Sequence, residues 1–363
     1  MSYIEDHHLD PEGYPIAPGA ASTREPRSFA GQDSWYERLD GDMKTVIDTL
    51  VSLGGKPVET LSAEDARRQP TPADAAKKIL AERKMDGMAD LGVKTRDIII
   101  TGAAGSLPAR LYGVEDDASN HKPRPVVVYW HGGGFVIADL ETYDSSPRAI
   151  AKFASCIVVS CHYRWAPENK FPAAHDDAFA AYQWVLANAA SFGGDPTNIA
   201  VMGESAGGNL AANVAIRARD QGVQAPVYQV LVYPVAGKDM ETASYVENAA
   251  AKPLNKPMMR WFVEKYLADP SQASDPRINL LAADLSGLPD ATIVSAEIDP
   301  LCSEGEALSD KLTAAGSKVR HHTFKGVTHE FFGMGLIVKD AAAAEQMVAH
   351  NLKRAFGTAI LPL

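Results

Sequence analysis

A serine at position 205 stands between two glycines, Gly203 and Gly207, in the stretch Gly-Glu-Ser-Ala-Gly. An apolar run at residues 199–202 leads into it, and residues 209–216 have the composition and spacing of a helix. A serine on a sharp turn between a strand and a helix is typical of a catalytic nucleophile, because the turn exposes its hydroxyl at the C-terminal edge of the sheet. Glycine is needed on both sides, where a side chain would strike the neighbouring backbone. The pattern predicts that Ser205 is a nucleophile.

Three consecutive glycines, Gly132 to Gly134, follow the apolar run of residues 125–129. Without side chains to shield them, their backbone N–H groups can converge on a developing negative charge, as an oxyanion hole requires. We predict that the N–H groups of Gly132, Gly133 and Ala206 stabilise such an oxyanion. The alternative is a flexible or phosphate-binding glycine loop. Phosphate binding would need a Lys-Ser/Thr pair or a helix that starts at the glycines, and neither is present.

A serine nucleophile needs a base and an acid, which follow it in the order acid and then histidine when the serine lies on a turn of this kind. Residues 291–296 and 318–324 are predicted as consecutive parallel strands, and Asp299 and His329 come shortly after them. Both side chains should therefore lie on the same edge of the sheet as Ser205. His329 would take the serine proton, and Asp299 would fix the tautomer of the imidazole and stabilise the imidazolium.

Other acids and histidines could fill these roles. Glu297 and Glu304 compete with Asp299 for the acid, but the Asp-Pro turn at the strand exit favours Asp299. Glu204, beside the nucleophile, is expected to have a hydrogen-bonding or helix-N-terminal role. Three histidines upstream are expected to be structural, with His131 supporting the glycine loop: His131, His162 and His175.

Four separated blocks, in order along the chain, resemble the bacterial hormone-sensitive-lipase-like esterases, often called family IV, within the α/β-hydrolase fold. The blocks are residues 129–135, residues 162–174, the glycine-flanked Ser205, and residues 299–301 together with 329–334. The sequence departs from the family pattern at three positions. Glu204 stands where the family usually has Asp, Trp165 where it has Leu, and Glu330 where it has Gly. All three departures place a larger or longer side chain near the site.

The expected fold is therefore an α/β-hydrolase fold with a mostly parallel, twisted sheet of about eight strands, flanked by helices and covered by a helical cap. Strands alternate with helices from residue 126 onward, after an antiparallel hairpin within residues 96–112. We expect an N-terminal arm and helices over residues 1–92, a catalytic domain over residues 93–234 and 289–363, and a cap insertion over residues 235–288. The resemblance implies that the N-terminal helices also belong to the cap.

The loop of residues 162–174 contains two prolines, which predict a rigid segment, and Arg164 and Glu168 have the charges to pair and hold it. Aromatic side chains near the site are candidate walls of a substrate pocket. These candidates are Phe135, Trp165 and Phe331.

Composition limits the kinds of partner. The chain has 363 residues and a net charge of −11, which argues against nucleic acid and anionic membrane. It contains no run of 18 apolar residues and no basic, apolar signal sequence at its start, so we expect a cytoplasmic protein. Its three cysteines are too few for a disulfide framework.

These features together predict a carboxylic ester hydrolase that acts on short- to medium-chain acyl esters through an acyl-enzyme, without a metal or an organic cofactor. An amidase or a carbamate hydrolase could use the same triad. A non-catalytic receptor for a small ligand is a further alternative, since plant gibberellin receptors resemble these esterases but lack the catalytic histidine; the presence of His329 argues against it. The resemblance suggests a homodimer, formed through the strand near residues 318–324.

Overall fold

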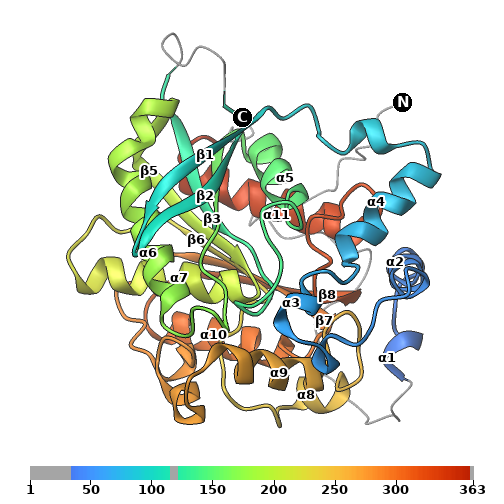
Figure 1. Ribbon diagram of the computed structural model, residues 1–363. Coiled ribbons are helices and arrows are strands. Elements are labelled where there is room, and N and C mark those ends of the chain that lie inside the picture. Colours follow the sequence, from blue (N-terminus) through green and yellow to red (C-terminus); the bar gives the residue numbers. More distant parts are fainter. Residues whose placement is uncertain (1–33, 115–121, 360–363) are drawn as a thin grey trace.

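The computed structural model describes residues 34–114 and 122–359. Within these residues, one eight-stranded sheet has the order β1-β2-β4-β3-β5-β6-β7-β8 (Figure 1). β2 pairs antiparallel with β1 and β4, and the remaining neighbours pair in parallel. The predicted fold class and the N-terminal hairpin are confirmed. The strands are β1 (Thr95–Gly102), β2 (Gly105–Tyr112), β3 (Arg124–Trp130), β4 (Ile157–Cys161), β5 (Gly194–Glu204), β6 (Gln229–Val232), β7 (Ala291–Ile298) and β8 (Val319–Thr328).

Helices precede the sheet, alternate with its strands and recur in the long segment between β6 and β7. The α-helices are α1 (Ser34–Glu37), α2 (Gly41–Ser52), α3 (Ala63–Ala66), α4 (Pro72–Glu82), α5 (Ser145–Ala154), α6 (Ala173–Asn188), α7 (Ala206–Asp220), α8 (Ala243–Glu247), α9 (Lys256–Tyr266), α10 (Cys302–Ala314) and α11 (Lys339–Ala355). The 3-10 helices are η1 (Val58–Thr60), η2 (Asp86–Met88), η4 (Ala189–Phe192), η5 (Pro270–Ser274) and η6 (Leu280–Ala282).

The sheet separates two hydrophobic cores, because successive side chains of a strand point to opposite faces. Along β3, Val126, Val128 and Trp130 belong to the core beneath α6, α7 and α10. Val127 and Tyr129 belong to the other core, which α5 and α11 cover together with α2 and α4. Burial on both faces explains why the central strands read as continuous apolar runs.

Two segments outside the sheet meet beside the active-site edge. The stretch from η1 to α3 packs against α9, and the Trp261 indole donates a hydrogen bond to the Leu61 carbonyl over 3.1 Å. α4 begins with a reciprocal cap, in which the Thr71 side chain accepts from the Asp74 N–H and the Asp74 carboxylate accepts from the Thr71 N–H. The first 33 residues of the predicted N-terminal arm lie outside the described residues.

No helix in the described part of the chain combines the length and the apolar character that crossing a lipid bilayer requires.

Candidate active site

The turn at Ser205 has the strained geometry that its sequence predicts. β5 ends at Glu204 and α7 begins at Ala206, so Ser205 alone forms the turn, with φ 56° and ψ −117°. A Cβ on Gly203 would lie 2.1 Å from the Gly207 carbonyl oxygen, and one on Gly207 would lie 2.0 Å from the Trp130 carbonyl oxygen. Only glycine fits either position, because both contacts are with backbone.

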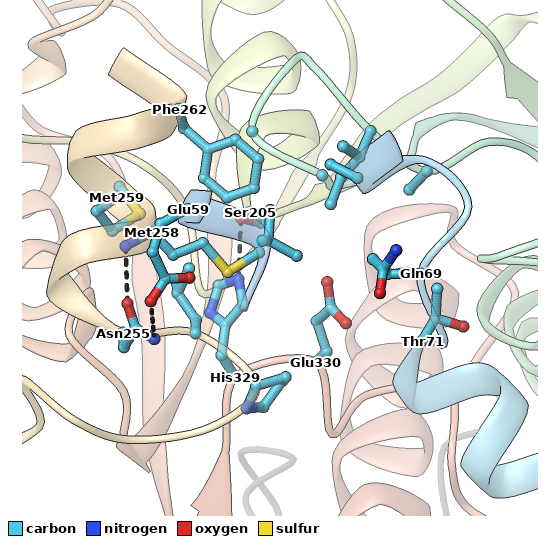
Figure 2. A pocket seen from close by; sticks show the side chains of 18 of the residues that line it. Glu59, Gln69, Thr71, Ser205, Asn255, Met258, Met259, Phe262, His329 and Glu330 are labelled. Carbon is cyan, nitrogen blue, oxygen red and sulfur yellow. Dashed lines mark hydrogen bonds between the residues drawn. The ribbon is translucent and has the colours of Figure 1, made fainter. Parts of the chain in front are cut away.

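Three side chains from the ends of three strands form one hydrogen-bonded chain. His329 Nε2 lies 2.9 Å from Ser205 Oγ, and His329 Nδ1 lies 2.7 Å from Asp299 Oδ2. An ionised carboxylate can only accept, so Nδ1 carries the proton and Nε2 is free to accept from the serine hydroxyl. The Leu301 N–H donates to the other Asp299 oxygen over 2.9 Å and fixes the carboxylate. Figure 2 shows the Ser205–His329 bond at the cavity.

The carboxylate of Asp299 controls the basicity of His329. Burial lowers the pKa of the His329 imidazole, but the charge and hydrogen bond of Asp299, together with the charges of Glu330 and Glu204, outweigh burial and leave this pKa above its ordinary value. Asp299 itself is completely buried. A base with a raised pKa holds the serine proton more firmly once it has taken it.

The competing acids have other partners. The Glu297 carboxylate accepts from the Gly326 N–H over 3.0 Å. Glu304 accepts from the N–H groups of Ala236 and Gly237 over 2.8 and 2.7 Å. Asp299 is therefore the acid that the structure brings to His329.

Glu204 is buried beneath the nucleophile, where it accepts hydrogen bonds from the hydroxyls of Tyr129 (2.7 Å) and Tyr233. Burial raises the pKa of Glu204 to about 7. The hydrogen-bonding role expected from the sequence agrees with this placement. Tyr233 also packs against the His329 ring, with 4.5 Å between ring centroids.

The glycine loop rests on His131. Its Nδ1 donates to the Gly132 carbonyl over 2.7 Å, and its Nε2 lies 3.0 Å from His162 Nδ1. Burial lowers the pKa of His131 to about 3, so the ring is neutral and adds no charge next to the oxyanion loop. Tyr163 donates a further hydrogen bond to the Gly132 carbonyl over 3.0 Å. These contacts agree with the supporting role expected for His131.

The N–H groups of Gly132, Gly133 and Ala206 are available to donate hydrogen bonds to a substrate oxygen. Ala206 is the first residue of α7, where an N–H has no acceptor within the helix. In residues 34–114 and 122–359, no hydrogen bond uses the N–H of any of the three. Gly133 has φ 99°, and a Cβ there would lie 2.1 Å from the Ile137 carbonyl oxygen. The loop conformation therefore requires glycine at Gly133, while the oxyanion role of the three groups stays a prediction.

A cavity of about 430 Å³ opens over Ser205 and His329. Of the three aromatic candidates, Phe135 and Trp165 line it. Phe331 does not: it is completely buried beneath the site and packs against Tyr233 and Phe324, with ring centroids 6.0 and 5.5 Å away. Its prediction as a pocket wall was wrong, because a loop sequence does not tell which way its side chain turns.

The sequence predicts a cap from residues 235–288 and the N-terminal helices, but it named none of their side chains as walls of the cavity. α9 supplies Met258, Met259 and Phe262, and the segment between α2 and α4 supplies Glu59 and other residues (Figure 2). The Phe262 ring is so close to the glycine loop that a Cβ on Gly134 would lie 2.2 Å from it. The amphipathic pattern of α9 was a usable signal, since such a helix must bury one face.

The expected pairing of Arg164 with Glu168 was wrong. Arg164 binds the buried Asp177 of α6, with Nε and Nη2 2.7 and 3.1 Å from its two oxygens. Glu168 binds Arg67, whose Nη2 lies 2.7 Å from its Oε2. Each of the two charged side chains pairs with a residue outside the loop, and the spacing of residues within the loop does not indicate such partners.

Among the described residues, no group of three or more His, Cys, Asp or Glu side chains could hold a metal ion.

The fold and this site define a serine hydrolase of the α/β class. Residues 127–333 match the family described as alpha/beta hydrolase fold. The chain belongs to this family, and its resemblance to the hormone-sensitive-lipase-like esterases is confirmed.

Several similar proteins are named for their activity. The chain is 40% identical over 270 residues to carboxylesterase NlhH of Mycobacterium tuberculosis, covering 73% of this chain and 83% of the relative. It is 34% identical over 301 residues to an ethyl acetate hydrolase of Pseudomonas putida, covering 82% and 92%. The solved structure of an esterase from Pyrobaculum calidifontis matches with a TM-score of 0.77 and 35% identity, over 88% of this chain and 100% of that chain.

Proposed function

We propose that the protein is a carboxylesterase that hydrolyses its substrate through an acyl-enzyme on Ser205. The observation that carries this proposal is the continuous hydrogen-bonded chain from Ser205 Oγ through His329 to Asp299. Ser205 and His329 line a cavity, where a substrate can reach them. The esterase activity named for relatives at 34–40% identity supports the same reaction.

In the acylation step, Ser205 Oγ attacks the ester carbonyl while His329 Nε2 takes the hydroxyl proton. The carbonyl oxygen becomes an oxyanion, and the N–H groups of Gly132, Gly133 and Ala206 donate hydrogen bonds to it. Asp299 stabilises the imidazolium that has formed. When the tetrahedral intermediate collapses, the C–O bond of the ester breaks and His329 gives its proton to the leaving alkoxide, so that the alcohol departs.

Water then takes the place of the alcohol. His329 accepts a proton from the water as its oxygen attacks the acyl carbonyl, and the same backbone N–H groups hold the second oxyanion. Collapse of this intermediate returns the proton to Ser205 Oγ and releases the carboxylic acid. Protons and bonds balance without any group beyond these side chains and water.

The walls of the cavity support a short- to medium-chain acyl group. α9 and the segment from η1 to α4 enclose a space of about 430 Å³, within the range of pockets that bind small molecules. We assign these two segments to the predicted cap. The cytoplasmic location and the homodimer remain predictions; β8, where the dimer contact was expected, is an edge strand of the sheet.

The test is steady-state hydrolysis of p-nitrophenyl esters from acetate to palmitate, comparing the wild type with Ser205→Ala. We expect rates that peak at short or medium chains, and a loss in kcat of roughly 10³-fold or more in the variant, whose fold should be unchanged. Ser295→Ala is a matched control, because Ser295 is a buried serine on β7 that bonds His321. Turnover by Ser205→Ala at the wild-type rate would contradict the assignment of the nucleophile.

A further inference from the structure

Glu330, the residue after the base, has a backbone conformation that residues other than glycine rarely adopt. Its φ is 63°, in the left-handed region that glycine tolerates without strain. The family usually has glycine at this position. A non-glycine residue kept in such a conformation beside a catalytic histidine points to a role for its side chain.

The Glu330 carboxyl stands in the substrate cavity together with Ser205 and His329. In Figure 2 it lies between His329 and the stretch from Gln69 to Thr71 on the opposite wall. One of its oxygens accepts a hydrogen bond from the Tyr143 hydroxyl over 2.9 Å, which orients the group. The residue is half-buried, and burial is the main cause that raises the pKa of its carboxyl.

No lysine or arginine among the described residues forms an ion pair with Glu330. Arg67, which also lines the cavity, is bound to Glu168 and to the Val136 carbonyl. The Glu330 carboxyl therefore has a neutral tyrosine as its hydrogen-bond donor. A half-buried carboxyl without an ion-pair partner gains from a donor or a positive charge that arrives with a ligand.

Glu330 also stands where two cavities meet. A second cavity of about 120 Å³ lies between α4 and the loop before α11, and it shares Pro72, Thr142 and Glu330 with the larger one. A substituent of the substrate that extends from Ser205 toward this smaller space comes close to Glu330, which lines both cavities.

We propose that Glu330 is a specificity-determining residue that selects esters bearing a hydrogen-bond donor, an ammonium or a hydroxyl group, over esters with an alkyl group in the same place. This inference rests on the proposed esterase function. Glu330 binds the donor; because its charge also helps to raise the pKa of His329, the test compares esters within one set, whose reactions share the same base.

The test uses two matched sets of esters, since the donor could lie on either side of the scissile bond. The first set varies the alcohol: it consists of the acetate esters formed at the phenolic hydroxyl of tyramine, tyrosol and 4-propylphenol. The second varies the acyl group: phenyl 6-aminohexanoate, 6-hydroxyhexanoate and heptanoate. The quantity measured is kcat/KM for each donor ester divided by kcat/KM for the alkyl ester of the same set.

The variants are Glu330→Gln, which keeps size and removes charge, and Glu330→Gly, which suits the backbone conformation and keeps the variant testable if the glutamine form folds poorly. Glu297→Gln is the matched control, because Glu297 is another carboxyl near His329 that lines neither cavity and already accepts from the Gly326 N–H. Thermal unfolding verifies that each variant is folded.

We expect one set to show a donor-to-alkyl ratio above 1 in the wild type, and this ratio to fall about tenfold or more in both Glu330 variants but not in Glu297→Gln. A fall for the ammonium ester alone in Glu330→Gln identifies a cation as the preferred donor, and a fall for both donor esters identifies hydrogen bonding.

Equal losses for all members of a set would overturn the inference, because Glu330 would then act through His329. Ratios near 1 in the wild type, or the same fall in Glu297→Gln, would overturn it as well. A wild type that hydrolyses none of the esters would instead contradict the proposed function, so the two failures are distinguishable.

Discussion

At the scale of single residues, the Asp299 carboxylate has two effects on His329. It accepts the Nδ1 proton over 2.7 Å, which leaves Nε2 facing Ser205, and its charge keeps the pKa of the imidazole above its ordinary value. Only the neutral imidazole can act as the base. The rate should therefore increase as the pH rises through the pKa of His329.

Replacing Asp299 with Asn should separate these effects. The amide can present its N–H to Nδ1 and favour the wrong tautomer, so we expect kcat to fall roughly 10³- to 10⁴-fold. The pKa of His329 should also drop once the negative charge is gone, and the acid limb of the profile of kcat/KM against pH should move to lower pH. Steady-state kinetics from pH 5 to 9 measure both changes.

The matched control for this variant is Glu297→Gln. Its amide oxygen can still accept from the Gly326 N–H, and it has no contact with His329, so kcat should stay close to that of the wild type. If Glu297→Gln lost its activity while Asp299→Asn kept it, Glu297 and not Asp299 would be the acid of the triad.

At the scale of elements, the turn between β5 and α7 allows no side chain at Gly207. Ala at this position would place its Cβ 2.0 Å from the Trp130 carbonyl oxygen, and backbone atoms cannot move aside without disturbing β3. We expect Gly207→Ala to lose about 3 kcal/mol or more of unfolding free energy, together with activity. Urea denaturation gives the free energy.

Gly41→Ala is the control for that measurement. Gly41 is the first residue of α2, and no atom lies within 4 Å of a Cβ built there, so its unfolding free energy should change by about 0.5 kcal/mol or less. If Gly207→Ala were as stable and as active as Gly41→Ala, the close packing at the turn would be refuted.

The elements also show what the sequence could and could not predict. Ser205 was found because its motif is contiguous, and Asp299 and His329 because parallel strands bring the residues after them to one edge. The cavity wall depends on contacts between distant segments, such as Trp261 with Leu61, and no local pattern specifies those. Arg164 was misassigned for the same reason, because its partner Asp177 belongs to the next helix.

At the scale of the whole molecule, buried ionisable groups make stability depend on pH in two opposite ways. Burial lowers the pKa of several histidines below that of the unfolded chain, so their protonation favours unfolding as the pH falls below about 6.5. Burial raises the pKa of several glutamates, so the folded chain must release their protons as the pH rises. The histidines are His131 (about 3), His162, His175 and His321 (about 4); the glutamates are Glu204, Glu304 (about 7) and Glu345 (about 8).

These shifts predict a maximum of stability near pH 6.5 and a decline toward pH 8.5. As the pH rises through that range the unfolded chain loses the protons of these four histidines, which are already neutral in the folded chain, whereas folded Glu345 still holds a proton that the unfolded chain lacks. Glu345→Gln keeps an acceptor for the Gly335 N–H and has no proton to lose. The decline in unfolding free energy from pH 6.5 to pH 8.5 should therefore be about 1–2 kcal/mol smaller in this variant than in the wild type.

Chemical denaturation at the two pH values measures this decline. Glu264→Gln is the control, because the Glu264 side chain is 73% exposed, and its decline should equal that of the wild type. An unchanged decline in Glu345→Gln would mean that Glu345 is already ionised in the folded protein near neutral pH.

The hydrogen bond from Trp261 to Leu61 joins two stretches of chain that contribute walls to the cavity but none of the nucleophile, base or acid. Many of the residues that shape the cavity are thus encoded in different parts of the gene from the residues that break the bond. Mutations between residues 55–72 and 252–267 can alter the choice of ester while the reacting groups keep their places. A lineage of such enzymes can therefore diversify its substrates without reinventing its chemistry.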